Sequence, residues 1–189
     1  MRQTVVLTRL FARAPAAAEP PDARLYAAAV ARAAMPDFYR RLAVPDSFDG
    51  RFDLLVLHVH LLVRRLGQAD PLARETGQRV FDRLVATLDV SLRDLGVSDL
   101  KVGARVKEAA RGYYGRAVAY DRALADDGPE ALIAALARNL YATAAPPPRA
   151  VAQMAAYVRR AVAALESVPE AALLAGDVSF PDLLPDDAQ

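Results

Sequence analysis

Apolar residues recur at intervals of three and four along most of this chain, the spacing that gathers side chains on one face of an α-helix. The stretch from residue 49 to residue 66 is apolar around most of its circumference, which predicts a buried, central helix. A short helix is expected after Pro36, and longer ones are predicted over residues 22–35, 71–95, 99–124, 131–141 and 149–167. Asp22 is expected to cap the first of the longer helices at its N-terminus. We therefore expect an all-α, single-domain helical bundle of six to eight helices. The helix predicted over residues 99–124 is expected to pack along the central helix.

Residues 1–20 are expected to form a basic amphipathic helix followed by a linker. On a helical wheel, Arg2, Arg9 and Arg13 cluster opposite the apolar side chains, and the pair Pro20–Pro21 then breaks the chain. Such a helix either lies on the core with a solvated arginine edge or contacts an anionic membrane surface. The sequence leaves both interpretations open.

Residues 21–176 are expected to contain the helical domain, and residues 177–189 an acidic tail. The tail has no basic residue, and its aspartates surround isolated apolar side chains, namely Phe180, Leu183 and Leu184. Either this segment docks on its own domain or it forms a mobile end.

The residues between Leu88 and Val102 predict the end of one helix, a turn and the start of another. Gly96 supplies the positive φ that a helix C-terminus commonly needs, and Val97 is placed to pack back on the turn. Ser98 and Asp99 offer oxygens that would cap the next helix at its N-terminus.

The helix predicted over residues 99–124 has two unlike faces. One carries the stripe expected to face the core, formed by Val102, Val106, Ala109, Ala110, Tyr113, Ala117, Tyr120 and Leu124. The other side holds Gly103, Gly112 and Gly115, although each glycine costs roughly 1 kcal/mol of helix stability relative to alanine. The glycines leave a shallow strip with arginines near its edges, namely Arg105, Arg111 and Arg116. Either another helix of this chain packs on the strip or an external partner docks there.

The composition narrows the classes of function. A chain of 189 residues can bury one sizeable core, and its net charge of +1 argues against a dedicated nucleic-acid binder, which needs a concentrated basic surface. Cysteine is absent, which excludes disulfides and thiolate metal sites. No apolar run reaches membrane-spanning length and no secretory signal is evident, so we expect a cytoplasmic protein. Arginine dominates the basic residues, as in GC-rich bacterial genomes, and only Lys101 and Lys107 are lysines.

No constellation of catalytic residues is evident, and we expect neither an enzyme nor a bound cofactor or metal. Motifs for phosphate cradles, dinucleotides, serine nucleophiles and zinc proteases are all missing. His58 and His60 suggest a metal, but positions two apart on a helix point about 200° away from each other and cannot share an ion. Both are therefore interpreted as structural histidines.

A group of short segments carries a more specific signal: FDGRFD from Phe48, SLRDLGVSDL from Ser91, then KVG from Lys101, RVK from Arg105, YYGR from Tyr113 and AY from Ala119. Together they resemble the signature of the ubiquinol–cytochrome c chaperone family, which includes mitochondrial assembly factors for the respiratory bc1 complex. Ser98 and Tyr113 depart from that signature, in which glycine and phenylalanine are more usual.

The resemblance implies a non-catalytic assembly chaperone that holds newly made cytochrome b, or another precursor of a bc1 subunit. Its location would be cytoplasmic and peripheral at the inner membrane, with Arg2, Arg9 and Arg13 against the anionic surface. The partner-binding surface is expected around the Gly96 turn and the outward side of the next helix, on Arg93, Asp94, Asp99, Lys101, Arg105, Lys107, Gly112, Tyr114, Gly115 and Arg116.

A second class of function stays open. The surplus of apolar helix faces is also compatible with a helical protein that binds a small molecule or a lipid such as a quinone. A large closed pocket would favour that interpretation, whereas an open apolar or glycine-lined groove would favour the chaperone.

Overall fold

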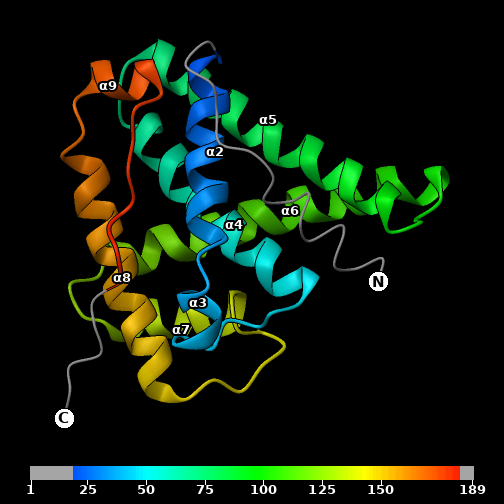
Figure 1. Ribbon diagram of the computed structural model, residues 1–189. Coiled ribbons are helices and arrows are strands. Elements are labelled where there is room, and N and C mark those ends of the chain that lie inside the picture. Colours follow the sequence, from blue (N-terminus) through cyan, green and yellow to red (C-terminus); the bar gives the residue numbers. More distant parts are fainter. Residues whose placement is uncertain (1–18, 184–189) are drawn as a thin grey trace.

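A computed structural model describes residues 19–183, and these residues form helices without any strand (Figure 1). The predicted all-α bundle is therefore confirmed. The helices are α2 (Pro21–Ala33), α3 (Asp37–Arg40), α4 (Phe48–Gly67), α5 (Pro71–Asp94), α6 (Asp99–Leu124), α7 (Glu130–Asn139), α8 (Pro148–Glu166) and α9 (Glu170–Ala175). The predicted N-terminal basic helix, with Arg2, Arg9 and Arg13, lies outside the described residues, and the division of the chain at residues 20 and 176 stays a prediction.

Helix α4 is the centre of the fold, as its periodicity predicts. It is buried along nearly its whole length, because α2, α5 and α8 pack around it. The side chain of Ser47 starts the helix by accepting a hydrogen bond from the backbone nitrogen of Gly50 at 3.2 Å. Helix α4 therefore lies in the middle of the bundle, although it comes early in the chain (Figure 1).

The expected packing of α6 along α4 needs correction. The backbone of α6 lies closest to α5 and α7, because α2, α5 and α8 already occupy the flanks of α4. Contact with α4 is made by side chains, which include apolar ones around Phe52 and two polar pairs. Arg116 reaches Asp53 at 2.8 Å, and the His60 ring lies 3.1 Å from a carboxylate oxygen of Asp121.

The loop that leads into α4 packs directly against the first turn of that helix. Gly50 lies under Pro45 so closely that a Cβ atom there would overlap the carbonyl oxygen of Pro45 and lie 2.8 Å from its Cβ. The loop is also held by the hydroxyl of Tyr141, which donates to the carbonyl of Leu42 at 2.7 Å. Ala43 adopts a positive φ of 53°, an unusual conformation for a residue other than glycine. The glycine of the FDGRFD segment is therefore required by a close approach of backbone.

Two expected helix caps are wrong. Asp22 is not the cap of α2, which is Pro20, but a buried residue of the first turn that pairs with Arg83 at 2.5 Å and so ties α2 to α5. Ser98 occupies the N-cap position of α6 without a side-chain hydrogen bond, and the carboxylate of Asp99 pairs with Arg93. In both cases the carboxylate near the start of the helix forms an ion pair with an arginine of another helix.

The chain after α8 adds an element that the sequence pattern did not predict, the short helix α9. Residues 177–183 then run extended and pack Val178, Phe180 and Leu183 against the main core. The described part of the acidic tail therefore docks on its own domain.

The contrast between two glycines gives a first prediction. Gly50→Ala should lower the free energy of unfolding by about 1–3 kcal/mol, because the methyl group must displace the Pro45 backbone. Gly115→Ala is the matched control, since nothing lies within 4 Å of the position of its Cβ, and it should raise stability by up to about 1 kcal/mol. Urea titration of both variants measures the difference, and equal effects would contradict the close packing at Gly50.

Candidate partner-binding surface

Helices α5 and α6 form an antiparallel hairpin whose far end extends beyond the other helices (Figure 1). Gly96 makes the turn with a φ of 84°, which confirms its predicted role. The backbone nitrogen of Val97 donates to the carbonyl of Leu92 at 3.0 Å, and that of Gly96 to the carbonyl of Arg93 at 2.9 Å. The turn is therefore fixed by the backbone itself.

The far end of the hairpin has a small apolar core of its own. Leu88, Leu92 and Val102 are buried there in a cluster separate from the main core. Partly buried side chains complete it, namely Phe48, Phe52, Val97, Val106 and Ala109. The start of α4 thus packs against the far end of the hairpin. This packing brings the FDGRFD segment into contact with the SLRDLGV segment.

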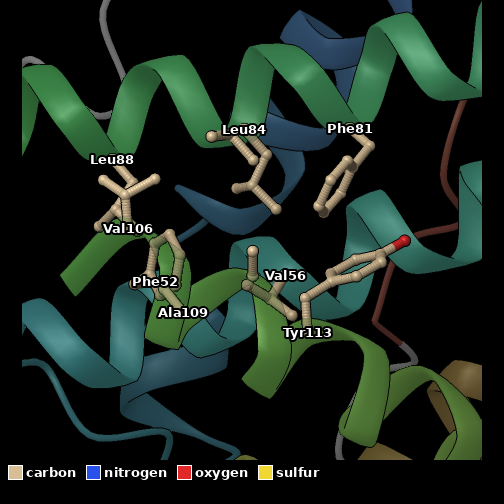
Figure 2. A pocket seen from close by; sticks show the side chains of 10 residues that line it. Phe52, Val56, Phe81, Leu84, Leu88, Val106, Ala109 and Tyr113 are labelled. Carbon is tan, nitrogen blue, oxygen red and sulfur yellow. The ribbon is translucent and has the colours of Figure 1, made fainter. Parts of the chain in front are cut away.

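A narrow apolar pocket lies where the hairpin meets α4. Figure 2 shows Phe52, Leu84 and Tyr113 among the side chains that line it, from α4, α5 and α6 respectively. The cavity measures about 10 Å³, room for roughly one water molecule. Pockets that hold small molecules enclose about 300–1,000 Å³. This pocket therefore gives no support to the interpretation as a lipid or quinone carrier.

The outward face of α6 is open. Nothing lies within 4 Å of the Cβ position at Gly103 or Gly115, and at Gly112 the nearest atom is a guanidinium nitrogen of Arg116 at 3.7 Å. The interpretation in which another helix of this chain packs on the strip is therefore wrong for the described residues. The strip is a surface that a partner's backbone can approach closely.

Apolar side chains accompany the glycines on this open face. Leu100 is 96% exposed, Tyr114 57% and Val118 50%. Leu100 and Val118 were missed as site residues from the sequence, although their spacing with Tyr114 follows a helical stripe opposite the core-facing one.

The predicted charged residues divide into two groups. Lys101, Arg105 and Lys107 are exposed and form no ion pair with the described residues, so their charges face solvent. Arg93, in contrast, is paired with Asp89 at 2.7 Å and with Asp99 across the turn. Asp94 lies exposed at the end of α5. The free positive charge of the surface therefore lies on the first half of α6.

Arg116 differs from the other predicted contact residues. Its guanidinium pairs with Asp53 of α4 at 2.8 Å, and the two side chains are 25% and 14% exposed. Burial raises the pKa of Asp53 to about 6, while the positive charge of Arg116 acts in the opposite direction. Arg116 therefore neutralises a partly buried carboxylate and anchors α6 to α4.

The two histidines of α4 point to separate structural partners. His58 is fully buried, where Nδ1 donates to the carbonyl of Leu54 at 2.8 Å and Nε2 accepts from the hydroxyl of Tyr157 at 2.8 Å. His60 donates from Nε2 to Asp121 at 3.1 Å. Within residues 19–183 no cluster of side chains could hold a metal ion. The prediction of structural histidines is confirmed.

The open face of α6 indicates a protein that binds other macromolecules. The known proteins that this chain resembles belong to the same class. The sequence pattern of the family described as ubiquinol-cytochrome C chaperone matches residues 40–180. Among curated relatives, the ubiquinol-cytochrome-c reductase complex assembly factor 1 of Xenopus laevis is 25% identical over 167 residues, which cover 88% of this chain and 83% of that protein. The Homo sapiens protein of that name is 25% identical over 162 residues, covering 85% of this chain and 54% of the relative. The chain thus spans about half the length of the human protein.

A solved structure shares the fold. The crystal structure of the Cbp3 homolog from Brucella abortus superposes with a TM-score of 0.79 at 35% sequence identity, covering 86% of this chain and 90% of that chain. The chain belongs to the ubiquinol-cytochrome C chaperone family. This is a family of chaperones, in agreement with the expectation of a protein without catalytic activity.

None of helices α2 to α9 combines the length and the apolar character needed to cross a membrane.

The burial of His58 predicts a pH dependence of stability. Burial lowers the pKa of His58 from 6.5 to about 4, so the unfolded chain binds a proton that the folded chain refuses. The contribution of the neutral ring is complete above pH 6.5 and is lost as the pH falls toward 4, by up to about 3 kcal/mol.

The matched variant His58→Gln isolates this contribution. The raised pKa of Asp53 acts with the opposite sign, stabilising the fold as the pH falls below about 6, but it is common to both proteins. Urea unfolding between pH 4 and 7 should show wild type losing more stability than His58→Gln. Parallel pH profiles would contradict the assignment.

Proposed function

We propose that this protein is an assembly chaperone that binds newly made cytochrome b, or another precursor subunit of the ubiquinol–cytochrome c reductase complex. Membership of the chaperone family and relatives named as assembly factors of that complex support this function. The observation that carries the proposal is the open face of α6, where glycines, exposed apolar side chains and free cations lie together.

The open face suits a helical client segment. Small residues allow two helix backbones to approach closely, and this is how helices of membrane proteins commonly associate. Gly112 and Gly115 provide the close approach, and Tyr114 between them offers an aromatic side chain of the type that dominates binding energies. Leu100 and Val118 extend the apolar contact toward both ends of α6. Binding there would cover apolar client surface before the other subunits arrive.

The charges around this face set the orientation of a client. Lys101, Arg105 and Lys107 line the half of α6 nearest the turn, where a client's carboxylates or an anionic headgroup would be attracted. Arg93, Asp94 and Asp99 edge the turn itself. Arg116 contributes through the anchoring of α6. Exposed cations of this kind affect the rate and specificity of association more than the stability of the protein.

Leucine substitutions on the strip test this surface. Gly115→Leu should leave the melting temperature unchanged or raised, because the position is open, and should reduce cytochrome b capture at least about tenfold by blocking the close approach. The matched control is Gly67→Leu, an equally open glycine at the end of α4. Capture is measured by co-purification of cytochrome b with each tagged variant from cells that assemble the complex. A folded Gly115→Leu variant that captures normally would place the client elsewhere.

The basic N-terminal segment is proposed to hold the chaperone at the anionic inner-membrane surface, peripherally and from the cytoplasmic side. Three clustered arginines near such a surface would contribute roughly 1 kcal/mol each. Replacing Arg2, Arg9 and Arg13 by glutamine should weaken sedimentation with anionic liposomes by at least about tenfold at low salt, with less effect at high salt. The same change at three exposed arginines elsewhere, Arg122, Arg138 and Arg149, controls for net charge. Equal losses for the two triple variants would remove the membrane role of the N-terminus.

A further inference from the structure

The C-terminal strap, residues 177–183, packs between α2 and α8, and the surface that it covers on α2, α4 and α8 is called the groove below. Figure 1 shows the strap running extended beside α8 after α9. Its side chains alternate, with Val178 and Phe180 partly buried while Asp177 and Ser179 are exposed. Extended peptides that bind to protein surfaces have the same arrangement, in which alternate side chains face the protein.

Arginines hold the strap at both ends. Asp177 pairs with Arg24 of α2. Asp182 accepts from Arg32 of α2 at 3.0 Å, and its backbone carbonyl accepts from Arg160 of α8 at 3.4 Å. The groove therefore presents cations from two helices, and the strap supplies the carboxylates.

The floor of the groove combines buried aromatic rings with a buried cation. Phe180 lies edge-on to the ring of His58 with centroids 5.0 Å apart. His58 is bonded to the hydroxyl of Tyr157, which also accepts from Nε of Arg32 at 3.2 Å. The guanidinium of Arg32 further lies 5.4 Å from the ring centre of Phe38. An aromatic side chain and a carboxylate are what this floor is built to receive.

Arg32 makes the groove depend on an outside carboxylate. Its side chain is 9% exposed, whereas that of Asp182 is 94% exposed. Among the described residues, Asp182 is the acidic partner of Arg32. A nearly buried cation without a paired anion lowers the stability of the fold. The guanidinium of Arg32 therefore requires a carboxylate in the groove.

The strap is attached without backbone pairing. Residues 178–183 form no backbone–backbone hydrogen bond with the rest of the described chain. Segments without backbone hydrogen bonds to their neighbours are among those that open locally. The strap is thus held through its side chains and one backbone carbonyl, and not by backbone pairing with a helix or strand.

We propose that this groove is a second docking site, which binds an extended acidic segment of a partner polypeptide, and that the strap is its displaceable occupant. The partner segment would carry an aromatic side chain two residues before a carboxylate, as Phe180 and Asp182 do. The groove is built from α2, α4 and α8, so it is separate from the open face of α6 and does not rest on the function proposed for that face. A partner with this motif competes with the strap for Arg32 and for the face of His58.

The test uses the full chain with the strap released and the strap's own sequence as the probe. The substitutions Phe180→Ser and Asp182→Lys together remove the aromatic contact and repel Arg32. A labelled peptide spanning residues 176–187 is then titrated with each protein and followed by fluorescence anisotropy. The released variant should bind the peptide at least about tenfold more tightly than wild type, because the tethered strap competes at high effective concentration. A control peptide that carries Phe180→Ser and Asp182→Asn should not bind.

Asp127→Lys is the matched control, since it changes the charge equally at an exposed loop position and should bind the peptide like wild type. If the double variant fails to fold by circular dichroism, Phe180→Ser alone replaces it, because that substitution leaves the ion pair between Arg32 and Asp182 in place. A folded released variant that does not bind the peptide, or that binds it no better than wild type, overturns the proposal. A wild-type dimer that the free peptide dissociates also overturns it, because the groove would then exchange straps between two copies.

Discussion

The burial of α4 is the constraint on which the rest of the structure depends. A helix that is apolar around most of its circumference cannot leave a face in water, so α2, α5 and α8 must surround it. Their mutual spacing then follows from the side chains of α4, and α6 and α7 have to find their places outside this inner group. The loop that packs on Gly50 holds the first turn of α4.

Three polar residues on α4 give this apolar assembly its specificity. Asp53 requires Arg116, His58 requires Tyr157, and His60 is bonded to Asp121. Hydrophobic burial alone would allow the outer helices to rotate or slide, whereas a buried polar atom without its partner carries a large penalty. The polar pairs therefore set the register of α6 and α8 relative to the central helix, and they place the glycines of α6 on the outside.

What could be predicted from the sequence is what local patterns determine. The 3.6-residue periodicity located α4, and Gly96 located the turn, because both signals lie within a few residues of the structure they cause. Asp22 was mistaken for a cap, since its partner Arg83 is 61 residues away and leaves no mark in the local pattern. The strap was ambiguous for the same reason, because Arg32 and His58 define its site only after folding. On the candidate surface, the glycine strip was visible, but the openness of that strip and the anchoring role of Arg116 depend on tertiary packing.

The separate cluster of Leu88, Leu92 and Val102 has a consequence for how the molecule could evolve. Because Phe48 and Phe52 are the partly buried apolar side chains that pack against both clusters, substitutions of Leu92 or Val102 and of distant main-core residues should add with little interaction. The end of the hairpin is in this sense a module within a single domain. Its surface can be remodelled for a different binding partner while the stability of the inner helices is kept, as long as Phe48 and Phe52 continue to join the two.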